Sequence, residues 1–121
     1  MRAVVRIAVL AAIVFGTCHA EPVLMPIDEV FSPEMLWSEG QIIVLEWVSD
    51  DLLIGDEDRQ CCEMIYDEFV GRVAVVNVRS VFRGPDHYYF IGQVWVGDVC
   101  VNDRICEIIT KIVSEREDEG V

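Results

Sequence analysis

Cysteines are the residues of this 121-residue chain best suited to covalent chemistry. Cys61 and Cys62 are adjacent, and Cys100 and Cys106 follow later. Neighbouring Cα atoms lie about 3.8 Å apart, below the disulfide span of about 4.4–6.8 Å, so a bond between Cys61 and Cys62 is disfavoured. We expect two disulfides that connect this pair to Cys100 and Cys106, in an order that the sequence leaves open. A local bond between Cys100 and Cys106 is the alternative.

The same cysteines match a zinc site poorly. Structural zinc ligands usually come in pairs separated by about two to four residues. Here one pair is adjacent, and five residues separate Cys100 from Cys106. We therefore expect no metal ion and no other cofactor.

His87 is the other candidate for chemistry, beside Tyr88. No serine or cysteine nucleophile motif accompanies this histidine, so it lacks the partners of a catalytic triad. We interpret His87 as a solvated residue at a strand edge and predict no catalytic residue.

Carboxylates crowd into one segment, Asp50–Asp58. A calcium-binding loop places its acidic ligands at alternate positions, but Leu52 and Ile54 occupy such positions here. We interpret the segment as a solvated acidic loop. Two carboxylates could also serve a small hydrolase, but no pair is marked out by its spacing.

Residues 1–20 have the layout of a secretory signal peptide. Arg2 and Arg6 give a positive start, Ile7–Phe15 is an uncharged apolar run, and Ala20 is a small residue at the expected cut. The run is shorter than the roughly 20 residues of a membrane-spanning helix. We predict cleavage after Ala20, no membrane span in the mature chain, and a secreted or periplasmic location where disulfides form.

The mature chain, Glu21–Val121, would be strongly acidic. Loss of Arg2 and Arg6 leaves 7 of the 9 basic residues against 22 acidic residues, a formal net charge of −15. Such a charge argues against nucleic-acid binding, which needs a basic surface, and favours encounter with a basic protein.

Hydrophobic periodicity predicts a single α+β domain over residues 21–121, with a small, strongly curved antiparallel sheet. Helices are expected over Arg59–Val70 and at the C-terminus from Asn102–Asp103, with a frayed tail over 115–121. The expected strands are Gln41–Val48, Arg72–Phe82 and, as one long or two short strands, His87–Val101.

The N-terminal part reads differently. An irregular lead-in, Glu21–Phe31, contains two prolines. A short helix is expected to start at Ser32, which resembles an N-cap, and to end at Gly40.

The pattern also predicts which side chains face the core. In the helix over residues 59–70, the apolar stripe is expected to comprise Cys62, Ile65, Tyr66 and Phe69. The first half of the strand from Arg72 is expected to be buried on both faces. Trp47 is expected in the core, and Gly92 is expected to mark a bulge or kink.

Two strand segments resemble those of exported OB-like domains. Gln41–Ser49 resembles the opening strand of these domains, and Val76–Pro85, with its Arg-Gly-Pro ending, resembles a later strand. OB-like domains of this kind are related in fold to netrin-like modules and to the inhibitory domain of tissue inhibitors of metalloproteinases. The resemblance implies a small, partly closed OB-like barrel but no activity. The inhibitors begin with a cysteine that reaches the target metal, whereas this mature chain would begin with Glu21.

These features favour an exported binding or inhibitor protein without catalytic activity, acting on a basic protein such as a cell-wall-degrading enzyme or a toxin. The expected contact surface contains Tyr88, Tyr89 and Phe90, because successive strand residues face opposite sides and at least one of them should face outward. Asp98 and Asp103 are expected to contribute as well. The second hypothesis is an envelope-associated structural protein with no soluble target, and the third is a small carboxylate-dependent hydrolase.

Overall fold

The computed structural model of the chain describes residues 21–119, so the predicted signal peptide, residues 1–20, lies outside the described residues. Within them, seven strands form one sheet and two helices pack against it. The strands are β1 (Glu21–Pro26), β2 (Glu29–Ser32), β3 (Met35–Ser38), β4 (Gln41–Leu45), β5 (Val73–Arg83), β6 (Tyr88–Val96) and β7 (Val99–Cys100). The helices are α2 (Glu57–Phe69) and α3 (Val101–Glu119).

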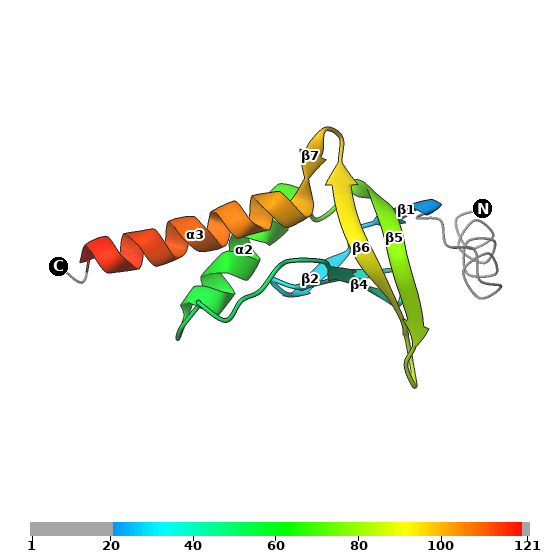
Figure 1. The fold of residues 1–121 in the computed structure, drawn as a ribbon, viewed down its shortest axis with the longest axis horizontal. Helices are drawn as coiled ribbons and strands as arrows, with labels where there is room; N and C mark the ends of the chain where they lie inside the picture. The colour runs from blue at the N-terminus through cyan, green and yellow to red at the C-terminus, as the bar shows by residue number, and fades with distance from the viewer. Residues whose placement is uncertain (1–20, 120–121) are drawn as a thin grey trace.

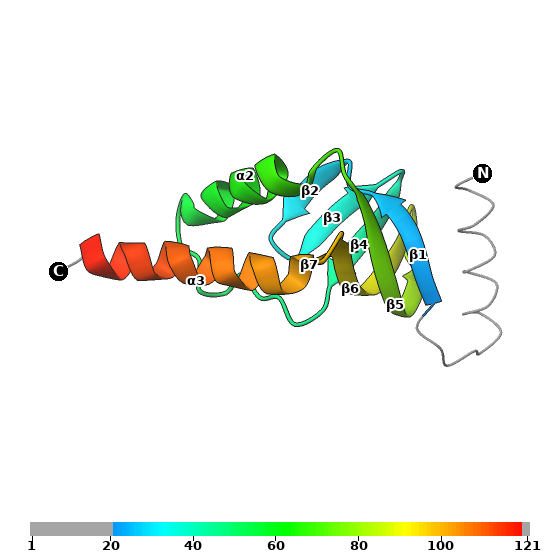
Figure 2. The same cartoon turned by 90° about the horizontal axis from the view of Figure 1, so that it is seen from above.

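The sheet curls strongly into a half-barrel, and both helices lie on the same side of it (Figure 1 and Figure 2). The strand order is β1-β5-β6-β4-β3-β2, and β7 pairs with the end of β6. Neighbouring strands are antiparallel except β4 and β6, which are parallel. The predicted α+β fold is confirmed, with its curved sheet, its helix near residues 59–70 and its C-terminal helix.

Alternation along the strands places every second residue in the core. On β5, Ala74, Val76 and Val78 are buried, whereas Val73 is 50% exposed. The expectation that the first half of this strand is buried on both faces is therefore wrong, because the helices cover only one face. The helices complete the core with one apolar face each, which comprises Cys61, Ile65 and Phe69 of α2 and Ile105, Ile108 and Ile112 of α3.

The apolar stripe of α2 is rotated from the predicted one. Cys61 is fully buried with Ile65, whereas Cys62 is half-buried and Tyr66 is 48% exposed. Both stripes satisfy helical spacing, so the pattern alone did not decide between them. Cys62 and Tyr66 instead line a groove between α2 and β2.

The N-terminal predictions were wrong, because the expected lead-in and short helix form strands β1, β2 and β3. Ser32 does not cap a helix; its hydroxyl accepts a hydrogen bond from the Glu34 N–H at 3.2 Å within a tight turn. Gly40 has φ +82° and closes the turn between β3 and β4. A helix of two turns is marginal in isolation, so pairing with β4 decides the structure.

Gly92 permits the closest approach between β5 and β6. A Cβ atom at this position would lie 2.0 Å from the main-chain oxygen of Asn77. The register between the strands shifts at the same place, between Val78 and Ser80 of β5. The expected bulge at Gly92 is confirmed, although the extra residue lies in β5 opposite the glycine.

α3 runs to Glu119 and therefore includes residues 115–119 of the tail that was expected to fray. Its C-terminal turns extend beyond α2 (Figure 1). No helix within residues 21–119 combines the length and the apolar character needed to cross a membrane.

Candidate functional site

The five predicted contact residues do not lie together. Tyr88 and Tyr89 begin β6, whereas Asp98 lies in the turn that follows the end of β6. A strand rises about 3.3 Å per residue, so about 30 Å separates the two groups. Phe90 is fully buried in the core, which removes it from the surface that a partner could reach.

Asp98 and Asp103 do meet, in a groove beside the N-terminal end of α3. The groove has a volume of about 490 Å³. Its lining comes from α2, from the hairpin of β6 and β7, and from α3, and comprises Glu68, Trp95, Asp98, Val99, Cys100, Asp103, Arg104 and Glu107. Glu68, Trp95 and Glu107 were not expected from the sequence, because only the packing of three separate elements brings them to Asp103.

The charges in this groove are unbalanced. The Arg104 guanidinium donates to Glu68 at 3.0 and 3.1 Å and to Glu107 at 3.2 Å. The hydrogen bond to Glu68 raises the pKa of Arg104, so this side chain stays charged. No lysine or arginine within residues 21–119 makes an ion pair with Asp98 or Asp103. Four carboxylates thus surround a single cation, and two of them remain available to a basic ligand.

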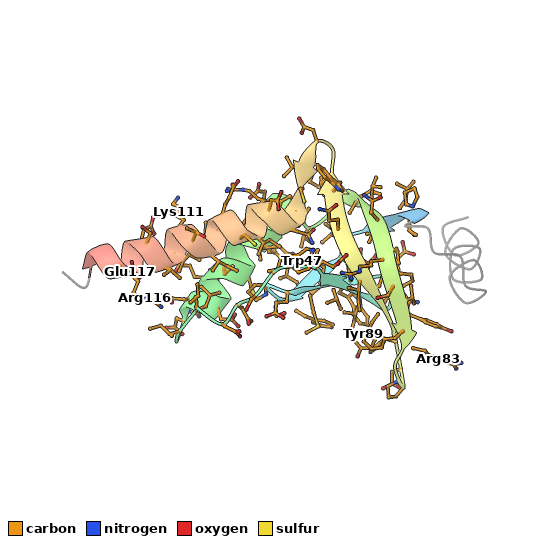
Figure 3. All side chains as sticks on the ribbon, in the orientation of Figure 1. Trp47, Arg83, Tyr89, Lys111, Arg116 and Glu117 are labelled. Carbon is orange, nitrogen blue, oxygen red and sulfur yellow. The ribbon has the colours of Figure 1, made fainter. Side chains whose placement is uncertain are left out.

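A second depression of about 650 Å³ continues along α3 and shares Asp103 and Glu107 with the first. Its other lining residues are Cys106, Thr110, Lys111 and Ser114, which recur at helical spacing. The two depressions form one surface, here called the α3 groove. Figure 3 shows Lys111 on the outward side of the helix.

Asn102 fixes the α3 groove to the sheet. Its side-chain oxygen accepts from the Val94 N–H at 2.8 Å, and its amide donates to the carbonyls of Glu46 at 2.9 Å and Gly92 at 3.1 Å. This amide occupies the gap beside β6 between the end of β4 and the start of β7. The predicted N-cap role is wrong, because α3 already begins at Val101 and the side chain bonds to the sheet instead.

Trp47 lies next to the α3 groove and is 83% exposed, so its predicted place in the core is wrong. The strand β4 ends at Leu45, and Trp47 adopts a left-handed backbone conformation with φ +67°. Its carbonyl oxygen accepts from the Cys106 thiol at 3.8 Å. The chain therefore turns away from the sheet here, which points the indole toward solvent.

Three carboxylates gather where the acidic loop meets the turn before β3. Ligand oxygens of Glu34, Asp50 and Asp51 lie within 4.8 Å of one another, close enough to share one cation. A hydrogen bond with Asp50 raises the pKa of Glu34, and the negative charges of Asp50 and Asp51 raise it further. Burial, followed by the charge of Asp50, raises the pKa of Asp58. The expected solvated loop is thus a cluster of mutually repelling carboxylates.

All four cysteines are free thiols in the structure, and their disulfides remain a prediction. Burial raises the pKa of Cys61 to about 12 and that of Cys62 to about 11. Burial, then the charges of Asp103 and Cys100, raises the pKa of Cys106. A thiolate is disfavoured at each of these three positions, so none of them is an activated nucleophile.

The aromatic residues at the start of β6 form contacts within the sheet. Tyr89 stacks on Phe82 with ring centroids 4.6 Å apart, and the Arg83 guanidinium lies 6.0 Å from the centre of the Tyr88 ring. His87 is half-buried; it contacts the edge of Trp37 at 5.0 Å, and its Nδ1 lies 3.2 Å from the Gly40 carbonyl oxygen. These contacts connect the β5–β6 hairpin to the β3–β4 turn.

Comparison with known proteins gives no match to any family model, any curated protein or any solved structure.

Proposed function

We propose that this chain is an exported, non-catalytic binding protein that holds a basic segment of a protein partner in the α3 groove. The observation that carries the proposal is the meeting of Asp98 and Asp103, from different elements, in a groove where neither has a cation. A lysine or arginine side chain of the partner would supply the missing charge.

The other walls of the groove suit the same ligand. Trp95 and Val99 provide apolar surface beside the carboxylates, and an arginine can stack on an indole while it pairs with an acid. The formal net charge of −15 expected for the mature chain would accelerate encounter with a basic protein. Attraction over distance and a local charge deficit thus favour the same class of partner.

Export and an inhibitor-like role belong to the same proposal. The signal-peptide layout of residues 1–20 supports export. The resemblance to OB-like, netrin-like and metalloproteinase-inhibitor domains is supported at the level of a curled half-barrel, which is loosely compatible with an OB-like sheet. The metal-reaching cysteine of those inhibitors has no counterpart at Glu21, so the proposed mode of binding depends on acidic side chains.

Affinity capture with the purified protein tests the proposal. The Asp98→Asn/Asp103→Asn variant should bind a captured basic partner about tenfold more weakly or worse, a change of about 1.4 kcal/mol. A matched control, Glu63→Gln/Asp86→Asn, removes the same charge from exposed positions outside the groove and should bind normally. Equal loss in both variants would contradict a specific groove. Recovery only in the envelope fraction, with no soluble partner, would favour the structural alternative.

A further inference from the structure

Trp47 is held rigidly while its side chain stays in solvent. The carbonyl before it, that of Glu46, accepts from the Asn102 amide at 2.9 Å, and its own carbonyl accepts from Cys106. Both contacts come from α3. The left-handed backbone is unfavourable for a residue with a side chain, so the surroundings maintain it. A large aromatic side chain presented in this way is suited to anchor an interface.

Two more apolar side chains continue this surface along α3. Leu52 is 64% exposed and Ile54 is 60% exposed. The Arg116 guanidinium holds their loop by donating to the Leu52 carbonyl at 3.2 Å and to the Glu57 carboxylate at 2.6 Å. Ten residues of α3 separate Cys106, which contacts Trp47, from Arg116, so the loop follows about 15 Å of the helix. Figure 3 shows Trp47 and Arg116 at separate points along α3.

The surroundings of these apolar side chains are acidic. Asp50 and Asp51 lie between Trp47 and Leu52 in the chain, and Glu34 joins them in the carboxylate cluster. No lysine or arginine of the described part of the chain forms an ion pair with the cluster. The surface thus combines exposed apolar groups with negative charge that has no counterion.

Resting on the proposed function, we propose that the partner docks a basic amphipathic helix on the Trp47 surface, defined as Trp47, Leu52 and Ile54 with the carboxylates of Glu34, Asp50 and Asp51. An apolar stripe on the helix would cover the three exposed side chains, and flanking lysines or arginines would meet the carboxylates. About ten residues of helix would span the 15 Å from Trp47 to Leu52. A protein segment fits better than a membrane, because anionic lipid headgroups would be repelled by the same carboxylates.

A synthetic probe tests this docking directly. The probe is an amphipathic helical peptide of about 18 residues built from leucine and lysine, long enough for about 27 Å of helix. A peptide with glutamate in place of lysine is the matched control. Binding of the lysine peptide should shift tryptophan emission to shorter wavelength as the Trp47 indole leaves water. Trp47→Phe should abolish the shift but keep most of the affinity, because Phe retains an apolar ring.

Variants separate an anchor from a general acidic attraction. Trp47→Gly should weaken peptide binding about 30-fold, which corresponds to about 2 kcal/mol. The thermal midpoint of this variant should not fall, because glycine accepts the left-handed backbone. Leu52→Ala should also weaken binding, whereas Leu24→Ala, at a 58% exposed position on β1, should leave it unchanged.

The outcomes distinguish this inference from the function on which it rests. Wild-type affinity in Trp47→Gly would overturn the Trp47 surface, as would equal binding of the glutamate peptide. Binding to phosphatidylglycerol vesicles in place of the peptide would also overturn it and indicate a membrane surface. Loss of affinity for the captured partner in Asp98→Asn/Asp103→Asn would still support the proposed function in each of these cases.

Discussion

The side-chain oxygen of Asn102 accepts a hydrogen bond from the main-chain N–H of Val94 at 2.8 Å, and through it the first turn of α3 is bonded to the middle of the sheet. The same side chain donates to carbonyls on two further segments, at Glu46 and Gly92. One buried amide therefore positions three parts of the proposed binding region: the α3 groove, the end of β6 and the backbone before Trp47.

Asn102→Ala should lower the free energy of unfolding by about 2–4 kcal/mol, because it leaves the buried Val94 N–H and two carbonyls without partners. Urea denaturation followed by circular dichroism measures the change. Asn77→Ala is the matched control, because Asn77 is half-buried on β5 and its side chain makes no hydrogen bond among the described residues. A loss below about 0.5 kcal/mol in Asn102→Ala would contradict the assigned role.

Gly92→Ala should destabilise the fold by at least about 3 kcal/mol, because the new Cβ would lie 2.0 Å from the Asn77 oxygen and backbone cannot move aside cheaply. Gly71→Ala provides a comparison of a different kind. Gly71 has φ +91° and open space around it, so only the backbone conformation opposes the change and about 1 kcal/mol is expected. Equal costs at the two positions in thermal unfolding would contradict the close approach of β5 and β6.

Pro22 and Pro26 should protect the open edge of the sheet at β1. The Ile27 N–H donates to the Arg72 carbonyl at 2.9 Å, so the odd-numbered residues bond toward β5 and the even-numbered ones face the edge. Two of the three edge-facing positions of β1 are thus prolines, which have no N–H to offer.

Pro22→Ala/Pro26→Ala should therefore aggregate at lower concentration than the wild type, as measured by light scattering at a matched fraction folded. Pro85→Ala, in the β5–β6 turn, is the control. Unchanged solubility of the double variant would show that the prolines do not guard the edge.

Acidification from neutral pH should stabilise the protein through Glu34 and Asp58. Each carboxyl has a pKa raised above its ordinary value of 4.5 or 3.8, so the folded state binds protons more tightly than the unfolded state. The stabilisation is absent at neutral pH and appears as the pH falls through the raised pKa values.

Glu34→Gln should increase stability at pH 7 and reduce the further gain on acidification to about pH 5. Its amide oxygen can still accept from the Asp50 N–H, a bond of 3.1 Å in the structure. Chemical denaturation at several pH values measures the effect, with Asp86→Asn as a control. A variant that is less stable than the wild type at pH 7 would contradict net repulsion at Glu34.

Local patterns were sufficient where they spanned many residues. The eleven residues of β5 carry continuous β-branched character, and α2 and α3 have long amphipathic repeats, so each was predictable without tertiary contacts. The short segment from Ser32 to Gly40 carried a helix-cap signal and a strand signal together. Pairing with β4, a contact between different segments, decided it.

The candidate site was predictable only in part. Asp98 and Asp103 were identified from their position between a strand and a helix, but Glu68 reaches them from α2 across the packed fold. Trp47 was placed in the core because it follows an apolar strand. The strand ends two residues earlier, at Leu45, and hydrogen bonds from α3 turn the chain outward. Such contacts have no signature in a single sequence.

The most direct test of the account is a calorimetric titration of the purified protein with its captured partner at low and high salt. We predict that the affinity falls steeply between about 0.1 M and 1 M salt, as the screening length shrinks from about 10 Å to about 3 Å. In Asp98→Asn/Asp103→Asn, we predict weaker binding at low salt and a shallower salt dependence. Affinity that is independent of salt and equal in the two proteins would contradict recognition by the acidic α3 groove.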